Sequence, residues 1–331
     1  MPRPLALALL AILVTACAPV LRDSDRGAIA GRTYVVTGAS SGFGRGVAER
    51  LGSMGANVVL AARRGAVLEE VAGRVRAGGG QALVVPTDVA ELDQVERLAR
   101  AAEERFGHID VWVNNAAVGA IGRFEEIPLT DHARVVQVNL NGTIHGSHAA
   151  LRRFRAQGFG TLVNISSVEA RVPLAYHASY AATKAGILAL GTALNEELRL
   201  NGLDDRLRVV SVLPWAADTP FWDHAGNYSG RSPRGFLMDD GQEVADAIVW
   251  VSVNPRPVFA VGWKAEAAVL GSHLAPVFTE RMAGNLIHRA QIENPPPAPP
   301  TPGAIHAPVM AGTGVDGGTR ARIAREDAAR P

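Results

Sequence analysis

A tyrosine and a lysine four positions apart could carry proton-transfer chemistry. Only two of the 33 Lys and Arg residues are lysine, and one of them, Lys184, follows Tyr180 by four positions. A compact ammonium can lie beside a phenol and lower its pKa, which suits general acid or base work near neutral pH. Residues 178–200 are rich in Ala and Leu and contain no Pro, so we expect a helix on which positions i and i+4 share one face. Taken alone, the pair also occurs by chance, and its interpretation depends on the surrounding motifs.

A glycine-rich turn near the start of the chain supplies that context. The apolar run Thr33–Thr37 is typical of a buried strand, and Gly38, Gly42 and Gly44 follow it before a helical stretch. Glycines allow the backbone to approach a pyrophosphate closely, and a helix N-terminus offers N–H groups and a positive dipole to the same anion. The spacing differs from Gly-x-Gly-x-x-Gly, so a structural turn is the competing interpretation. The flanking strand and helix favour a dinucleotide site.

These segments belong to an ordered series of motifs. The series reads Thr37-Gly38-x-x-x-Gly42-x-Gly44, Asp88-Val89, Asn114-Asn115-Ala116-Ala117, Asn139, Ser167 and Tyr180-x-x-x-Lys184. In order and spacing it resembles the short-chain dehydrogenase/reductase family over residues 32–261. The resemblance implies a Rossmann-type doubly wound parallel α/β sheet and hydride transfer between a nicotinamide cofactor and a carbonyl or secondary alcohol.

The resemblance also implies a role for each matched residue. Tyr180 would be the general acid/base, and Lys184 would lower its pKa and hold the nicotinamide ribose. Ser167, thirteen positions before the tyrosine, would hydrogen-bond the substrate carbonyl, which leaves Ser166 as structural. Asn139 would position a water in the proton relay. The cofactor set comprises the tyrosine and lysine with Gly38, Ser40, Ser41, Gly42, Phe43, Gly44, Asp88, Val89, Asn115, Pro214 and Thr219.

Two arginines indicate which cofactor binds. The expected second strand, Asn57–Ala62, ends in Arg63 and Arg64, where an NAD enzyme usually places an acid that holds the ribose 2′-hydroxyl. A guanidinium can hold a 2′-phosphate bidentately, so NADP(H) is favoured over NAD(H). Arg45 could add positive potential. The competing interpretation is that these arginines are solvated surface charges.

The substrate region departs from the family pattern. Pro214 is followed by Trp215 where the family usually has Gly, and Ala117 replaces another usual Gly. The loop must therefore run differently or turn the indole outward. Aromatic residues concentrate between positions 215 and 236, which suggests an apolar pocket wall. The substrate candidates are Glu169, Tyr176, Trp215 and Phe221.

One domain accounts for the rest of the core. Further strands are expected at 82–86, 111–115, 160–166, 208–213 and 258–261, and helices at 66–76, 91–106, 131–157 and 241–253. Their alternation indicates a parallel sheet with helices on both faces. We expect the catalytic domain over residues 29–265 and a helical extension over 266–293. The long helices 131–157 and 178–200 make a homodimer or homotetramer plausible.

The two ends of the chain lie outside this core. Residues 1–28 contain an apolar run of signal-peptide length and then Val14-Thr-Ala-Cys17, which resembles a bacterial lipoprotein box. Export with lipidation at Cys17 and a cytoplasm-facing membrane anchor through residues 1–17 both remain open. Residues 294–331 are rich in Pro and Gly, so we expect a disordered tail.

Charge and residue pattern give no support to two other classes of function, nucleic-acid binding and metal binding. A net charge of +1 gives no reason to expect nucleic acid, and no His or Cys cluster has metal-ligand spacing. The hypotheses are an NADP(H)-dependent oxidoreductase acting on a small-molecule carbonyl or alcohol, and a dinucleotide-binding regulator or scaffold without turnover.

Overall fold

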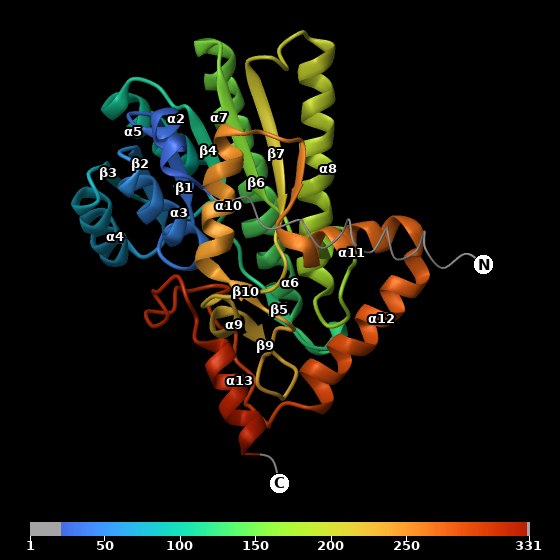
Figure 1. Ribbon diagram of the computed structural model, residues 1–331. Helices are drawn as coiled ribbons and strands as arrows, with labels where there is room; N and C mark the ends of the chain where they lie inside the picture. Colours follow the sequence, from blue (N-terminus) through green and yellow to red (C-terminus); the bar gives the residue numbers. More distant parts are fainter. Residues whose placement is uncertain (1–20, 330–331) are drawn as a thin grey trace.

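A seven-stranded parallel sheet runs through the computed structural model, which describes residues 21–329 (Figure 1). The strands are β1 (Thr33–Thr37), β2 (Asn57–Ala62), β3 (Gln81–Pro86), β4 (Val111–Asn114), β6 (Gly160–Ile165), β7 (Leu207–Leu213) and β11 (Val258–Ala260). Their order is β11-β7-β6-β4-β1-β2-β3. The order reverses between β1 and β4, where the carboxyl ends of an open sheet leave a ligand-binding crevice. The predicted doubly wound fold is confirmed.

Helices cover both faces of the sheet. One layer contains α3 (Gly42–Ser53), α4 (Gly65–Ala77) and α10 (Gly241–Val253), and the other contains α5 (Leu92–Phe106), α6 (Leu129–Val136), α7 (Gly142–Gln157) and α8 (Ala178–Leu200). In α5 the buried residues Val95, Leu98 and Ala102 recur at helical spacing, so one stripe of an otherwise charged helix faces the sheet.

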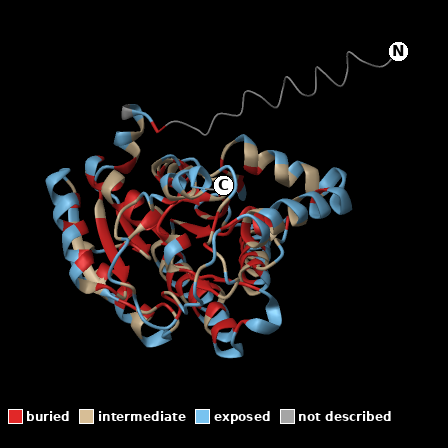
Figure 2. Cartoon of the chain, turned by 90° about the horizontal axis from the view of Figure 1, so that it is seen from below, coloured by how far each residue is buried: buried red, intermediate tan, exposed pale blue. Residues whose placement is uncertain are grey.

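The sheet separates two apolar cores. Tyr34 and Val36 point into the core beneath α3, α4 and α10, whereas Val35 points into the core beneath α5 and α7. This alternation follows from the two-residue period of a strand. Trp112 and Phe154 are fully buried in the second core, and burial of each large apolar side chain contributes about 1.5–3 kcal/mol. Figure 2 shows that buried residues concentrate in the sheet and on the inner faces of its helices.

One predicted helix is interrupted. Residues 131–157 form the end of α6, a π-helical turn at Gln137–Asn141 and then α7. A π-turn inserts an extra residue into the helical ladder and frequently marks a functional site. The break re-aims Asn139, as described below.

A helical arm and shorter elements, most of them at the carboxyl edge of the sheet, complete the fold. These are α2 (Arg26–Ile29), β5 (Ala120–Ile121), β8 (Ala217–Asp218), α9 (Phe221–His224), β9 (Gly226–Asn227), β10 (Asp239–Asp240), α11 (Gly262–Leu274), α12 (Pro276–His288) and α13 (Thr319–Ala328). Helix α11 runs outward from the sheet and α12 returns toward the C-terminal segment (Figure 1). The predicted helical extension therefore exists as a two-helix arm, which begins at Gly262 rather than at residue 266.

The C-terminal segment is not the disordered tail that its composition predicts. Bridges pair Asn227 with Thr301 and Arg231 with Pro297. Ile305 and Thr319 are fully buried, and α13 follows. The prediction from composition was wrong because this segment docks with few apolar side chains. Its main-chain carbonyls instead accept hydrogen bonds from the domain, as described for the site below.

The N-terminal boundary also differs from the expectation. Leu21 and Ile29 are buried in the first core, so the described chain already contributes to the domain before residue 29. The predicted anchor segment 1–17 and Cys17 lie outside the described residues. Within residues 21–329, no helix has both the length and the apolar character needed to span a bilayer.

Candidate active site

A cavity of about 670 Å³ follows the carboxyl edge of the sheet. At one end it is lined by the glycine turn after β1 and by Arg63 and Arg64 after β2, and at the other by the arm α11–α12. Ser167, Tyr180 and Lys184 lie on its wall between these ends. Of the predicted cofactor residues, Gly38, Ser40, Ser41, Gly42, Phe43, Arg63, Arg64, Asp88, Val89, Asn115, Pro214 and Thr219 also line it, while Gly44 lies behind them.

Tyr180 and Lys184 meet on α8 as their spacing predicts. The Lys184 ammonium lies 5.3 Å from the centroid of the Tyr180 ring and donates to the Ile165 carbonyl at 2.8 Å. That carbonyl belongs to the last residue of β6, so the sheet edge fixes the lysine. Phe221 lies across the cavity wall with its ring centroid 5.4 Å from that of Tyr180.

The electrostatics of this pair differ from the expectation. Burial raises the pKa of Tyr180 above its ordinary value, the Glu169 carboxylate raises it further, and a hydrogen bond with Ser167 lowers it only in part. Burial lowers the pKa of Lys184 to about 8, although Glu169 opposes that change. The expected depression of the phenol pKa is therefore absent, because burial and the Glu169 charge raise this pKa more than the Ser167 hydrogen bond lowers it. The phenol is held protonated, as a proton donor requires.

The two adjacent serines make different contacts. The Ser166 hydroxyl donates to the Lys184 carbonyl at 2.7 Å and braces α8 against β6. The Ser167 hydroxyl accepts from the Glu169 backbone N–H at 3.1 Å and lies on the cavity wall. Both residues line the cavity, but the Ser166 hydroxyl is committed to the Lys184 carbonyl.

Asn139 lies behind the cavity rather than on its wall. Its side-chain oxygen accepts from the Val118 N–H at 2.8 Å, and its side-chain NH₂ group donates to the Val118 carbonyl at 2.9 Å and to the Thr183 hydroxyl at 3.2 Å. The π-turn directs this fully buried side chain at the loop after β4 and at α8. It therefore holds the tyrosine helix and that loop together.

The glycine turn is packed too closely for side chains. Gly38 has φ +69°, and a Cβ on Gly44 would lie 2.3 Å from the Gly38 carbonyl oxygen. Asn115 closes the turn by donating from its side chain to the Thr37 carbonyl at 2.9 Å, while its backbone N–H donates to the Thr37 hydroxyl. These contacts fit a backbone cradle that a phosphate can approach.

Arg64 closes the other side of this cradle. Its guanidinium donates to the Ser40 hydroxyl at 3.0 Å and to the Ser41 hydroxyl at 2.8 Å. Burial lowers the pKa of Arg64, and the charges of Arg63 and Arg45 lower it further. Burial also lowers the pKa of Arg63, although Asp88 opposes this. Within residues 21–329, the acceptors of both guanidinium groups are hydroxyl and main-chain carbonyl oxygens, and no carboxylate lies within ion-pair distance.

The carbonyls come from a segment that the sequence did not indicate. Residues 306–318, here called the strap, cross the end of the cavity that Arg63 and Arg64 line. Arg63 donates to the His306 carbonyl at 2.9 Å and Arg64 donates to the Val309 carbonyl at 2.9 Å. The strap and the residue before it contain only a few large apolar residues, among them Ile305, Val309 and Met310, and this signal is too weak to place the segment.

The neighbouring cofactor candidates have mixed surroundings. Asp88 forms an ion pair with Arg134, and its carboxylate also accepts from the Ala90 N–H at 3.0 Å. Val89 is buried against Gly142 at the start of α7. Asp88 is thus held rigidly at the cavity edge and keeps acceptor capacity for a ligand.

The loop after β7, in which Trp215 stands where the family usually has Gly, leaves the cavity open. The Pro214 carbonyl accepts from the Val168 N–H at 3.1 Å, which fixes the start of the loop. The Trp215 indole N–H donates to the Phe236 carbonyl at 3.0 Å, so the ring forms part of the wall instead of filling the space. Thr219 packs beside Gly42.

The remaining substrate candidates separate into two groups. Glu169 lines the cavity and holds the buried His177 at 3.1 Å, and Gln291 bonds the far side of that imidazole. Burial opposes protonation of His177, but the carboxylate raises its pKa overall. Tyr176 is not among the cavity-lining residues, contrary to the expectation. Its hydroxyl instead bonds His288 at the end of α12 at 2.7 Å.

The outer end of the cavity is apolar. Its lining from the arm includes Trp263, Ala267, Phe278, Met282 and Leu286. Phe278 is 68% exposed and Met282 is 47% exposed, so this wall also opens to the surface. The cavity can thus accommodate an apolar group that extends away from Tyr180.

Comparison with known proteins places this geometry in a family. The sequence profile of the family described as short chain dehydrogenase matches residues 32–227. The uncharacterized oxidoreductase YxnA of Bacillus subtilis is 30% identical over 83% of this chain and 78% of its own length. 3beta-hydroxysteroid dehydrogenase 1 of Eggerthella lenta is 36% identical over 67% of this chain and 87% of its own length.

Two solved structures are similar in fold. An alcohol dehydrogenase from the archaeon Thermococcus sibiricus, complexed with 5-hydroxy-NADP, has a TM-score of 0.60 at 27% identity over 70% of this chain and 94% of its own. A short-chain dehydrogenase from Streptomyces avermitilis has a TM-score of 0.64 at 27% identity over 78% of this chain and 98% of its own. With the motif order and the parallel sheet, these matches show that the chain belongs to the short-chain dehydrogenase/reductase family of oxidoreductases.

Proposed function

We propose that this protein is an NADP(H)-dependent oxidoreductase that interconverts a carbonyl and a secondary alcohol. One observation carries the proposal: Ser167, Tyr180 and Lys184 face the same cavity that ends at Arg63 and Arg64. Proton-handling groups and candidate phosphate donors thus lie along one continuous space. A protein that binds the cofactor without turnover needs the phosphate donors but not the proton-handling groups.

The residues present fit the cofactor that the family implies. The glycine turn offers a cradle with no room for a Cβ at Gly44. Two partly buried guanidinium groups without carboxylate partners in residues 21–329 suit a dianionic 2′-phosphate, since charged acceptors compensate buried cations better than carbonyls do. The structure of the Thermococcus sibiricus relative with an NADP analogue supports the same choice.

The side chains at the centre of the cavity divide the work of carbonyl reduction. When bound, the nicotinamide supplies the hydride. Ser167 would donate a hydrogen bond to the substrate carbonyl oxygen, and Tyr180 would transfer its phenolic proton to that oxygen as negative charge develops. Lys184, fixed by the Ile165 carbonyl, would stabilise the phenolate left behind. In the oxidative direction the tyrosine would accept the proton.

The substrate that fits is lipophilic and larger than a simple ketone. The cavity wall beyond Tyr180 carries Val172, Leu174, Phe221, Phe278 and Met282. The Eggerthella lenta relative is named as a hydroxysteroid dehydrogenase, which supports testing a fused-ring ketone first.

Cofactor titration with the full chain tests the proposal. We expect NADPH to bind more tightly than NADH, and NADPH absorbance to fall on addition of a 3-ketosteroid or another apolar ketone. Tight binding without turnover across a wide carbonyl panel would favour the regulator or scaffold. Tighter binding of NADH would overturn the cofactor assignment.

Two further proposals concern location and assembly. We propose that residues 1–17 tether the enzyme to a membrane, either as a lipoprotein through Cys17 or as a cytoplasm-facing anchor. Fractionation of the full chain and of Cys17→Ser separates these alternatives, because only the lipoprotein loses its membrane association with the cysteine. We also propose a homodimer or homotetramer through α7 and α8, which light scattering of the purified protein tests.

A further inference from the structure

The strap is pinned at both ends and loosely held between them. Ile305 precedes it and Thr319 follows it, and both are fully buried, whereas no residue from 306 to 318 is buried. Segments with few buried apolar contacts open at low free-energy cost. The strap can therefore leave the domain while its ends stay in place.

Its contacts to the domain are made mainly by its own carbonyl groups. Donors from the glycine turn, α3, the end of β2 and α9 all point at it. The distances are 2.9 Å for Gly42 N to Gly314 O, 2.9 Å for Arg45 to Thr313 O, 2.9 Å for Arg63 to His306 O, 2.9 Å for Arg64 to Val309 O and 3.0 Å for His224 to Ala311 O.

These donors overlap with those that a nucleotide would use. This step rests on the proposed function, which assigns Gly42, Arg63 and Arg64 to the cofactor phosphates. Gly42 has one N–H, so it cannot donate to Gly314 and to a phosphate in the same direction at once. Phosphate oxygens are charged acceptors and form stronger hydrogen bonds with guanidinium groups than neutral carbonyls do. The strap and the cofactor thus compete, and the cofactor has the stronger chemistry.

We propose that the strap is an autoinhibitory segment that occupies the phosphate end of the cavity and that NADP(H) displaces on binding. Apparent affinity for the cofactor is reduced by the fraction of molecules in which the strap is docked. Any change that loosens the strap therefore strengthens cofactor binding.

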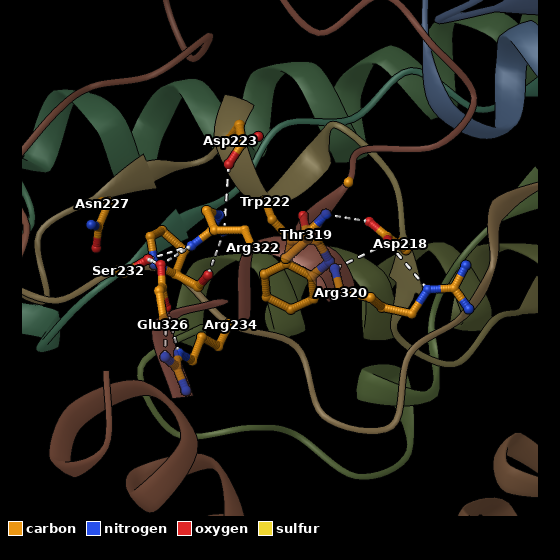
Figure 3. A network of polar contacts seen from close by, with 12 residues as sticks. Asp218, Trp222, Asp223, Asn227, Ser232, Arg234, Thr319, Arg320, Arg322 and Glu326 are labelled. Atoms are coloured by element: carbon orange, nitrogen blue, oxygen red, sulfur yellow. Dashed lines mark hydrogen bonds and ion pairs between the residues drawn. The ribbon is translucent and has the colours of Figure 1, made fainter. Parts of the chain in front are cut away.

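The anchor beyond the strap sets how far it can move. Asp218 accepts from the Thr319 N–H at 2.7 Å and from the Arg320 side chain at 3.1 Å, and Glu326 accepts from Arg234 at 2.9 Å (Figure 3). These contacts hold α13 against the loop after β7. Displacement is thus a local swing of residues 306–318 and leaves α13 in place.

Hydrogen exchange in the full chain tests the direction of the movement. Peptides covering 306–318 are compared with and without saturating NADPH, and peptides covering β6 serve as an internal control. We expect faster exchange in the strap when NADPH is present. Slower exchange would mean that the strap closes over the cofactor, and unchanged exchange with NADPH bound would mean that it does not compete. Either result overturns the proposal while leaving the proposed function intact.

A glycine variant supplies the second measurement. A Cβ on Gly317 would lie 2.3 Å from the backbone of Thr219, so Gly317→Ala prevents the docked position. Gly73→Ala in α4 is the matched control, because nothing lies within 4 Å of its Cβ position. We expect the dissociation constant for NADPH to fall about threefold to tenfold in Gly317→Ala and to stay unchanged in Gly73→Ala.

A milder variant guards against an effect of Gly317→Ala on Thr219 itself. His306→Ala removes the contact between a strap imidazole that is about half exposed and Asp131, and it should strengthen NADPH binding in the same direction but less. Weaker binding in both variants overturns the proposal. Binding by Gly317→Ala but not by the unaltered chain would support it most strongly. If neither binds NADPH or NADH, the proposed function fails as well.

Discussion

The proposed catalytic end of the cavity, at Tyr180 and Lys184, and its proposed phosphate end, at Arg63 and Arg64, are held by different kinds of contact. Tyr180 and Lys184 are neighbours on one helix, and the lysine bonds the end of the adjacent strand at 2.8 Å. Arg63 and Arg64 instead bond a segment more than 240 residues further along the chain. The first set is fixed by the sheet and its helices, and the second is satisfied by an exchangeable partner. Rigid positioning suits proton transfer, whereas a replaceable partner suits a site that must release and rebind a charged ligand.

The largest effect on activity should come from the end of the cavity at Tyr180 and Lys184. Tyr180→Phe removes the proton donor but keeps the ring against Phe221, so we expect kcat/KM to fall by roughly 10²–10⁴-fold while NADPH affinity changes little. Steady-state kinetics with titration of NADPH binding measures both. Tyr34→Phe is the control, since this tyrosine is buried in the core and bonds Ser252 at 3.3 Å. Full turnover in Tyr180→Phe would show that another group donates the proton.

The end of the cavity at Arg63 and Arg64 should control which cofactor binds. Arg64→Gln removes the guanidinium that bonds Ser40 and Ser41, so we expect the KM for NADPH to rise about tenfold to a hundredfold and that for NADH to change little. Arg76→Gln in α4 is the control, because Arg76 donates to the Ala82 carbonyl at an exposed position. Equal losses for both cofactors would place Arg64 away from the 2′-phosphate.

The pH dependence of kcat/KM should follow the protonation state of Lys184. The pKa of Lys184 is lowered to about 8 by burial, so the ammonium loses its proton as the pH rises through that value. We expect kcat/KM for carbonyl reduction to be constant near neutral pH and to fall roughly tenfold between pH 7 and 9. A profile that is flat to pH 10 would contradict the role of the ammonium. The phenol stays protonated through this range because its own pKa is raised.

The smallest effect should come from the arm. Phe278→Ala shortens the apolar wall at the outer end of the cavity, so we expect the KM for a fused-ring ketone to rise about threefold to tenfold. The KM for a short ketone that does not reach α12 should not change. Leu200→Ala, at a position that is 73% exposed on α8, controls for the loss of surface apolar area. Equal effects on both ketones would mean that the arm does not contact substrate.

Much of the fold could be predicted because its signals are local. The β1–turn–α3 unit, the alternation of strands and helices and the i, i+4 pair on α8 all follow from short-range patterns. The π-turn at Asn139 could not be predicted, because both of its flanking segments are good helices and only the contacts of Asn139 with Val118 and Thr183 show why the ladder is broken there.

The errors concern long-range packing. Tyr176 was expected in the cavity, but its hydroxyl bonds His288 on the arm. The pKa of Tyr180 was expected to be lowered by its lysine, but burial by residues distant in sequence raises it. Neither effect can be read from neighbouring residues, since each depends on which elements cover the site.

The sequence by itself determined the family, the doubly wound sheet and the placing of Tyr180 beside Lys184, because the spacing of residues along single helices and strand ends fixes their geometry. Only the tertiary structure decided the partners of the two arginines and the place of the Pro- and Gly-rich C-terminal segment. That segment docks through main-chain carbonyls, which every residue carries. A contact made by the backbone leaves almost no trace in the order of side chains, so it becomes visible only when the chain is folded.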